Sequence, residues 1–329
     1  MKRSAVLTAI VVVGATVAGV AAQRGGGGRG GGSLIPPTGT IEKIKDNLYK
    51  IPGAGSNTTV FVTADGVVLV DTKLANNGDA IMKQVRTVTD KPVTTLINTH
   101  VHPDHNGSND YFKAARRNVQ VVTHENTKKW VTANPKASRA WMPDTTFTNV
   151  ARLGSGRDQI ELYWFGAGHT DGDAFVVFPA LRAMCIGDLM AWNMAPLIDP
   201  QTKGSVIALP DTLEKALQEI KDVDLVIEGH GNVNTWAGLR AYAEFNRELL
   251  RVAQRSLKRG ETPEQALAEL EKNKKLAVFM KEELLPGLEY GNTPKARALI
   301  NINVAYQELK GEPVTTNFGP RGGGPAPAK

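Results

Sequence analysis

The chain has 329 residues, of which 41% are hydrophobic and 22% charged, with a formal net charge of +6 and a single cysteine. This balance is typical of a globular protein and excludes a chain that is disordered along most of its length. One cysteine excludes an intramolecular disulfide, and so modest a positive charge argues against a nucleic acid as a partner.

Residues 1–22 have the three parts of a secretory signal peptide. Lys2 and Arg3 precede an apolar run, which ends in the small residues Val20-Ala21-Ala22. A basic start, an apolar centre and a small-residue cleavage site are the features of an export signal. We therefore expect a mature protein that begins near Gln23, is periplasmic or secreted, and has no stable membrane insertion. An uncleaved anchor is the alternative, because the run approaches the ~20 apolar residues that span a bilayer.

Two further segments are too rich in glycine or proline to fold by themselves. Residues 23–40 are Gly-rich and then Pro-containing, and residues 313–329 have a similar composition. Neither segment buries enough apolar surface to offset the entropy lost on ordering. We expect a flexible linker and a disordered tail around a globular part.

Short strands and helices alternate over residues 41–235. Asp65-Gly66 lies between two apolar runs and is a strong hairpin signal, so this region begins with a β-meander. We expect a helix near 78–88 and strands at 47–51, 59–63, 67–70, 93–98, 119–123, 159–165, 174–178, 183–186 and 223–227. Nearly every strand ends in a polar or histidine-bearing loop, which is typical of stacked sheets that carry their chemistry on one rim.

Residues 236–312 have a helical character. Apolar residues recur at helical spacing from Trp236 onward, and we interpret this stripe as core. Further helix starts are indicated at Thr262-Pro263 and Thr293-Pro294, and helix ends at Gly260 and Gly311. We expect a helical extension that packs on the preceding domain.

Thr99-His100-Val101-His102-Pro103-Asp104-His105 carries the strongest chemical signal. Three histidines and an aspartate lie within six residues, directly after a predicted strand. Imidazole nitrogen and carboxylate oxygen are zinc ligands, and a set made only of nitrogen and oxygen also suits iron or manganese. The segment therefore predicts a metal site.

This His-x-His-x-Asp-His segment resembles the signature of the metallo-β-lactamase superfamily. The remaining parts of the family pattern follow in the family's order: Asp71 in VLVDT, His169 in GHTDGD, Asp188 in IGDL and His230 in EGHG. The resemblance spans roughly residues 47–231. It implies an α+β fold, a four-layer αββα sandwich, here with additional C-terminal helices.

The resemblance also implies two Zn²⁺ ions and seven ligands in two sets of three with one bridge. The first set is His100, His102 and His169; the second set is Asp104, His105 and His230; the bridge is Asp188. Asp104 and His230 would also act in catalysis, by orienting a metal-bridging hydroxide and by lying where the leaving group departs. Asp71, Thr170 and His124 would support the ligands from outside the coordination sphere, and a purely structural role for His124 is the alternative.

The implied reaction is hydrolysis of an ester, thioester, lactone or lactam bond in a small-molecule substrate. The family's β-lactamases generally carry cysteine or serine at the position of Asp188, whereas an aspartate there resembles the glyoxalase-type thioesterases and the acyl-homoserine lactonases. The tyrosine of the lactonases is replaced by Ala191. Cys185 lies within a predicted apolar strand, so we expect a buried, inert thiol.

Three alternatives to this zinc hydrolase hypothesis stay open. A β-lactamase proper has the same fold, and a phosphodiesterase of that fold would use the same two metals. A secreted scaffold with a decayed site is the third, although such a scaffold has no chemical reason to keep every ligand position. The sequence names neither the substrate nor the oligomeric state, because specificity depends on rim loops.

Overall fold

The computed structural model describes residues 35–115, 118–134, 142–282 and 293–315, which belong to one compact unit. The predicted signal peptide (1–22), most of the predicted linker and most of the predicted tail lie outside these residues. Among the described residues, no helix combines the length and the hydropathy needed to cross a membrane.

The first sheet has seven strands that follow one another in sequence order. They are β1 (Glu42–Lys45), β2 (Leu48–Ile51), β3 (Thr58–Val62), β4 (Val67–Val70), β5 (Val93–Ile97), β6 (Gln120–His124) and β7 (Thr145–Phe147). Strands β1 to β4 form the predicted antiparallel meander, and β4 to β7 are parallel. Parallel neighbours need crossover connections, and these contain α1 (Gly78–Val85), α2 (Pro103–Asn106), α3 (Asn109–Ala115) and α4 (Glu125–Ala133).

The second sheet has six strands and only one parallel pair. Its order is β13 (Val233–Thr235), β12 (Leu225–Glu228), β11 (Ala183–Gly187), β10 (Phe175–Phe178), β9 (Ile160–Tyr163) and β8 (Val150–Leu153). The parallel pair is β11 with β12, and its crossover contains α5 (Leu209–Glu219). Short 3₁₀ turns lie at Gly156–Asp158, Pro179–Leu181, Pro200–Thr202 and Lys274–Phe279.

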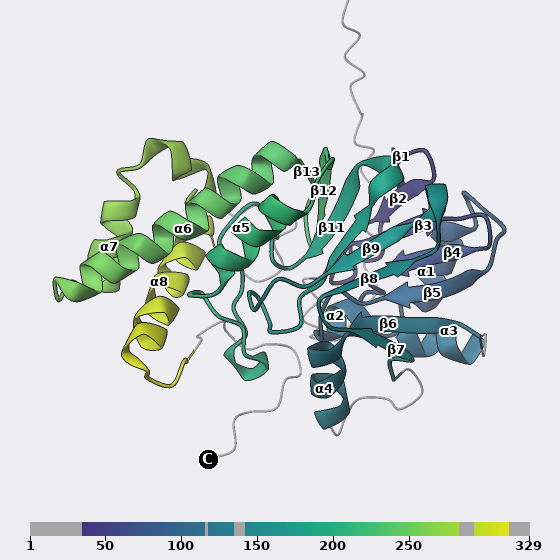
Figure 1. Cartoon of the computed structure of the whole chain (residues 1–329), viewed down its shortest axis with the longest axis horizontal. Helices are drawn as coiled ribbons and strands as arrows, with labels where there is room; N and C mark the ends of the chain where they lie inside the picture. The colour runs from purple at the N-terminus through teal and green to yellow at the C-terminus, as the bar shows by residue number, and fades with distance from the viewer. Residues whose placement is uncertain (1–34, 116–117, 135–141, 283–292, 316–329) are drawn as a thin grey trace, which may run out of the picture. The chain divides into compact units, whose positions relative to one another are not determined.

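Three hydrophobic clusters hold four layers together. Phe61 and Ile97 of the first sheet meet Val176 of the second in a cluster between the sheets. A second cluster joins the outer face of the first sheet to α1 and α3, and a third joins the second sheet to the C-terminal helices. Figure 1 shows the two sheets between these helical layers. The four-layer αββα sandwich with added C-terminal helices is confirmed.

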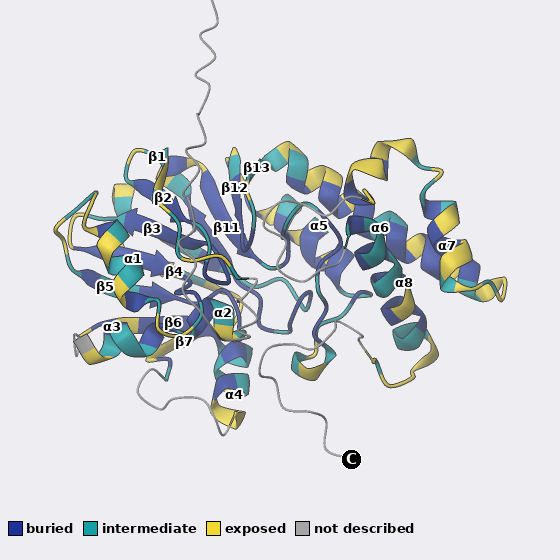
Figure 2. Ribbon diagram, turned by 180° about the vertical axis from the view of Figure 1, so that it is seen from behind, coloured by how far each residue is buried: buried dark blue, intermediate teal, exposed yellow. Residues whose placement is uncertain are grey.

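The C-terminal helices begin where the sequence predicts, and two of them end at or just before the predicted glycines. They are α6 (Trp236–Lys258), α7 (Pro263–Leu270) and α8 (Pro294–Lys310). Thr262 and Thr293 cap the starts of α7 and α8 with their side chains. Gly311 ends α8 in the left-handed conformation, which a glycine adopts without strain. Figure 2 shows the outward faces of α6 and α7 as exposed, whereas most of the strands are buried.

Four strands were not expected from the sequence, and they are the four edges of the two sheets. β1 and β7 end the first sheet, and β8 and β13 end the second. Edge strands bury little and often carry charged residues, so they lack the apolar pattern of interior strands. β1, with the sequence EKIK and no buried residue, is an example. The predicted strand at 159–165 is shorter, at Ile160–Tyr163, and the predicted helix at 78–88 ends at Val85.

Candidate metal centre

The parallel strand pairs bring the predicted ligand loops to one rim of the sandwich. Asp71 directly follows β4, and the segment that starts at Thr99 follows β5. Asp188 and His230 come just after β11 and β12, the parallel pair of the other sheet. Because parallel strands end at the same edge of a sheet, loops that are far apart in sequence converge there. His169 lies in the loop before β10.

The first predicted set, His100, His102 and His169, converges on one point. One ring nitrogen of each lies within 4.8 Å of the others, and Nε2 of His169 is 2.8 Å from Nδ1 of His102. Nε2 of His100 is buried and has no hydrogen-bond partner among the described residues. Burial lowers the pKa of His169 to about 3 and also lowers the pKa of His100. Neutral imidazoles of this kind are the form that binds a metal ion.

The second predicted set, Asp104, His105 and His230, is equally close. Oδ2 of Asp104 lies 3.6 Å from Nε2 of His105 and 3.4 Å from Nε2 of His230. One ligand atom from each of the three residues lies within 4.8 Å of the others. The backbone oxygen of Asp104 accepts a 2.6 Å hydrogen bond from Ser56, which connects this predicted ligand to the loop between β2 and β3.

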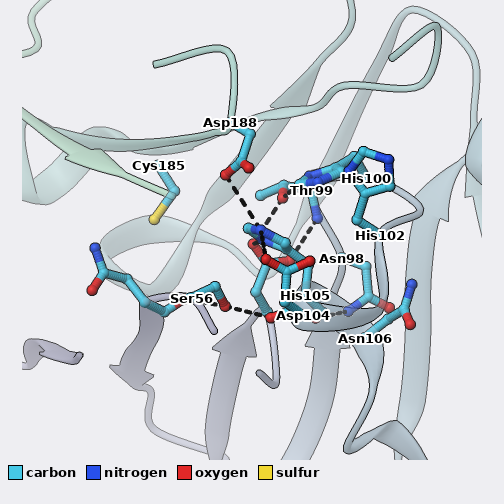
Figure 3. Close-up of polar contacts among 12 residues, drawn as sticks. Ser56, Asn98, Thr99, His100, His102, Asp104, His105, Asn106, Cys185 and Asp188 are labelled. Carbon is cyan, nitrogen blue, oxygen red and sulfur yellow. Dashed lines mark hydrogen bonds and ion pairs between the residues drawn. The ribbon is translucent and has the colours of Figure 1, made fainter. Parts of the chain in front are cut away.

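The carboxylate of Asp188 lies between the two sets. Its Oδ2 is 3.1 Å from Nε2 of His230 and 3.7 Å from Nε2 of His169, and its Oδ1 is 3.3 Å from Nε2 of His105. Figure 3 shows the Asp188 carboxylate pointing at the His105 ring. The absence of a side chain at Gly229 leaves room for the Asp188 carboxylate, because a Cβ atom at residue 229 would lie 2.0 Å from its Oδ1.

The second set concentrates negative charge in a buried place. Burial alone would lower the pKa of His105 and His230, but the carboxylates of Asp188 and Asp104 outweigh it. They raise the pKa of His230 to about 9 and raise that of His105 well above its usual range. The imidazoles in turn lower the pKa of Asp104 to about 2, against the effect of burial. Buried carboxylates need a compensating cation, and a metal ion would supply that charge.

The donor set fits metal ions by its chemistry and by its spacing. Tetrahedral zinc with bonds of ~2.0–2.1 Å separates its ligand atoms by roughly 3.4 Å, and the five nitrogen–oxygen separations around Asp104 and Asp188 run from 3.1 to 3.7 Å. Nε2 of His105 and Oδ1 of Asp188 are buried without a hydrogen-bond partner among the described residues. Orphaned buried polar atoms that face one another are expected of metal ligands.

Asp71 connects two parts of the predicted metal segment. Its Oδ2 lies 2.7 Å from Nδ1 of His105 and also accepts a hydrogen bond from the hydroxyl of Thr99, while its Oδ1 accepts from the Thr99 backbone N–H. The Thr99 hydroxyl lies 3.0 Å from Nδ1 of His100. Asp71 therefore contacts the outer nitrogen of a predicted ligand directly and that of His100 through Thr99.

Thr170 and His124, the other predicted supporting residues, make different contacts. Thr170 follows His169 and donates hydrogen bonds to Asp173 through its backbone N–H and its hydroxyl. His124 begins α4: its Nδ1 accepts from the Asn126 N–H, and its Nε2 lies 2.7 Å from the Thr148 carbonyl oxygen. Its ring also stacks on Trp164. None of these described partners of His124 is a predicted ligand.

Sequence reasoning missed two groups that hold the first set. Oδ2 of Asp199 lies 2.7 Å from Nε2 of His102, and the carbonyl oxygen of Leu197 accepts from Nδ1 of His169. Asp199 lies nearly one hundred residues after His102 and belongs to no recognisable motif. Every residue has a backbone carbonyl, so no sequence signal could have identified the role of Leu197.

A cavity of about 660 Å³ adjoins the centre at His230. Its lining includes Lys50, Asn57, Trp192 and Glu228. Trp192 and its neighbour Asn193 both have positive φ, a strained conformation for residues other than glycine, and the Trp192 ring stacks on His230 with centroids 4.3 Å apart. Burial raises the pKa of Glu228 to about 7.

Cys185 lies beside this centre without joining it. Its Sγ is 2.9 Å from the hydroxyl of Thr59, and burial raises the pKa of its thiol to about 12. Figure 3 shows Cys185 apart from the histidine rings. A protonated thiol is a poor metal ligand and a poor nucleophile.

The sequence profile of the metallo-beta-lactamase superfamily matches residues 51–230, which is more than half of the chain and a range that contains the positions of all seven predicted ligands. The chain belongs to the metallo-beta-lactamase superfamily. It is similar to two proteins named metallo-beta-lactamase type 2. That of Elizabethkingia meningoseptica is 26% identical over 59% of this chain and 79% of its own length. That of Bacillus sp. (strain 170) is 26% identical over 54% of this chain and 67% of its own.

Solved structures share the superfamily fold. A metallo-beta-lactamase from Pontibacter korlensis has a TM-score of 0.54 and 22% identity, over 63% of this chain and 98% of that chain. A double mutant of the sec-alkyl sulfatase PisA1 has a TM-score of 0.62 and 15% identity, over 82% of this chain and 50% of that chain. Homologues in this superfamily are metal-dependent hydrolases, and we assign the protein to this class of enzyme.

Proposed function

We propose that the protein is an exported, dinuclear zinc hydrolase that cleaves an ester, thioester, lactone or lactam bond in a small-molecule substrate. The observation that carries the proposal is the position of Asp188, whose two oxygens face histidines of both sets. A carboxylate in that place can bridge two cations. The same donor set accepts iron or manganese, so elemental analysis of protein purified without added metal identifies the native ion.

The chain's own residues divide the chemistry between them. Two bound zinc ions would supply Lewis acidity and a water molecule acidified to a pKa of about 7. Asp104, whose backbone oxygen is held by Ser56, would accept a hydrogen bond from that water and orient it. His230 lies where the centre meets the cavity, and it would lie next to the departing group.

The substrate is proposed to occupy the cavity beside His230. Trp192 forms an apolar wall against this histidine, and the Lys50 ammonium donates to the Gly231 carbonyl at 3.2 Å. Asn57 donates to the same carbonyl and thereby connects the loop between β2 and β3 to the loop after β12. A cavity of about 660 Å³ has the size of small-molecule sites in general.

A β-lactamase proper is the first alternative, since the curated relatives carry that name. Asp188 counts against it, because the resemblance places cysteine or serine there in such enzymes.

A phosphodiesterase of the same fold is the second alternative. Among the described residues, Lys50 is the one basic side chain lining the cavity, apart from the ligand His230, which gives a phosphodiester little charge to bind.

A hydrolysis screen of the zinc-loaded protein tests the proposal. The panel contains nitrocefin, a lactone, a thioester, a nitrophenyl ester, bis(p-nitrophenyl) phosphate and a sec-alkyl sulfate. We expect turnover of at least one carboxylic ester, thioester, lactone or lactam, and loss of that turnover in His100→Ala. Hydrolysis of the phosphate or sulfate ester alone would contradict the proposed substrate class, and no turnover of any probe would contradict the proposed reaction.

A further inference from the structure

Residues 196–208, here called the strap, contact the outer face of two ligands of the same set. Oδ2 of Asp199 lies 2.7 Å from Nε2 of His102, and the Leu197 carbonyl accepts from Nδ1 of His169. In each case the other ring nitrogen is the one that faces the neighbouring histidine. Hydrogen bonds to the outer nitrogen of a metal-binding histidine fix its tautomer and its ring orientation.

Backbone hydrogen bonds fasten the strap to the loop that carries His169. The Asp199 N–H donates to the His169 carbonyl at 2.9 Å, and the Ser205 N–H donates to the Gly168 carbonyl at 2.9 Å. The Gly204 N–H closes the turn onto the Asp199 carbonyl at 2.8 Å. A movement of the strap would therefore move His102 and His169 together.

Helix α8 holds the strap from its other side. The Glu308 carboxylate accepts hydrogen bonds from the Ser205 hydroxyl at 2.6 Å, the Val206 N–H at 2.9 Å and the Ile207 N–H at 3.3 Å. The buried Asn301 donates to the Pro196 carbonyl at 3.1 Å. The two ends of the strap are thus held by one helix of the C-terminal extension. Three of the four hydrogen bonds are accepted by the Glu308 carboxylate, and hydrogen bonds to a charged group are the stronger kind.

We propose that the C-terminal extension positions the first set of ligands, with Asp199 and Leu197 acting directly and Glu308 and Asn301 acting through the strap. This inference rests on the proposed ligand assignment. It gives α8 a role that the αββα sandwich does not require, because α8 lies outside the residues that match the superfamily profile. These four are positioning residues, since they are argued to act through His102 and His169.

Other contacts among the described residues hold the second set. His105 is held by Asp71, and His230 stacks on Trp192. A weakened strap should therefore lower the affinity of one metal and spare the other. A loss of affinity at one site only would distinguish positioning of the ligands from a general loss of protein stability, which would weaken metal binding at the two sets alike.

The test compares Glu308→Ala with Asn303→Ala in the full-length protein. Asn303 is exposed on the same helix, and its side chain donates to the Leu299 carbonyl one turn earlier. Zinc affinity is measured by chelator competition. Cadmium NMR of the cadmium-loaded protein gives one resonance for each bound ion, so the two sites can be followed separately. Outer contacts of metal ligands typically change affinity 10- to 100-fold, so we expect a loss of about tenfold at one site for Glu308→Ala and none for Asn303→Ala.

Asp199 supplies the conservative comparison. The Asn side chain keeps an oxygen that accepts from His102, so Asp199→Asn should retain most of the affinity that Asp199→Ala loses.

Hydrogen exchange over residues 196–208 gives a readout without metal: Glu308→Ala should raise exchange there, and Asn303→Ala should not. Unchanged exchange, or equal weakening of the two sites, would overturn the inference. If the wild-type protein binds fewer than two metals, the proposed function fails, and the exchange experiment still tests whether α8 holds the strap.

Discussion

Oδ2 of Asp188 lies 3.1 Å from Nε2 of His230. The opposite oxygen of the same carboxylate lies 3.3 Å from Nε2 of His105, and Oδ2 itself is 3.7 Å from Nε2 of the more distant His169. A carboxylate with three histidines around it can set the separation of the ions that those histidines would bind. Asp188 is therefore the residue whose removal should change the centre most specifically.

We predict that Asp188→Ala weakens mainly the metal held by Asp104, His105 and His230. It should also lower kcat/KM by at least the 10- to 100-fold that is typical when a contact outside the coordination sphere is removed. The loss should appear in kcat, because the proposed nucleophile would depend on two metals. The measurements are elemental analysis and steady-state kinetics on the substrate that the screen identifies. Asp222→Ala is the matched control, since Asp222 is 83% exposed and pairs with Arg182. Two retained zinc ions and near-normal kcat would show that Asp188 is no bridge.

We predict that His124→Ala keeps the metal content and loses stability. The substitution removes the side-chain cap of α4 and the stack on Trp164. Helix caps and aromatic pairs each contribute on the order of 1 kcal/mol, so the free energy of unfolding should fall by about 1–3 kcal/mol. Denaturant titration and elemental analysis of the same preparation measure the two quantities. Loss of a metal would show that His124 contributes to the centre after all.

We predict that Cys185 stays protonated and unreactive in the folded protein. Its folded pKa is raised to about 12 from the ordinary 9.0, so the stability linked to this thiol is complete below pH 9 and is lost as the pH rises toward 12. The free-energy difference between wild type and Cys185→Ala should shift by up to about 1.4 kcal/mol per pH unit across that window. Iodoacetamide at pH 8 should modify the thiol only after unfolding. Rapid modification of the native protein would contradict this.

We predict that the exported protein begins near Gln23. The prediction follows from the small residues Val20-Ala21-Ala22 after an apolar run, a segment outside the described residues. Intact-mass spectrometry of protein recovered from the periplasm or medium of a bacterial host measures it. A mass that includes Met1 would favour the uncleaved anchor.

Much of the fold and most of the centre could be predicted because their signals are local. Strands buried on two faces carry continuous apolar runs, and the residues from His100 to His105 are contiguous in sequence. Asp71 and Asp188 immediately follow such strands, where parallel neighbours bring loops to the same rim. The pairing of Asp188 with both sets, by contrast, depends on two sheets meeting face to face, and only the structure supplies those distances.

The strap could not be predicted, because its contacts depend on tertiary structure. Asp199 lies in a segment without motif or periodicity, and Leu197 acts through a backbone atom. Glu308 reaches the strap across about one hundred residues of sequence. The sequence predicts the start of α8 at Thr293-Pro294 and its end at Gly311, whereas the partners of its polar side chains follow from how the helices pack.

Elemental analysis of the wild-type protein after loading with excess zinc and removal of free metal tests the central claim most directly. Seven proposed ligands, in two sets with Asp188 between them, predict about two zinc ions per chain. His102→Ala should reduce this to about one, because it removes a member of the first set only. One zinc ion or none in the wild-type protein would contradict the dinuclear centre and with it the proposed mechanism.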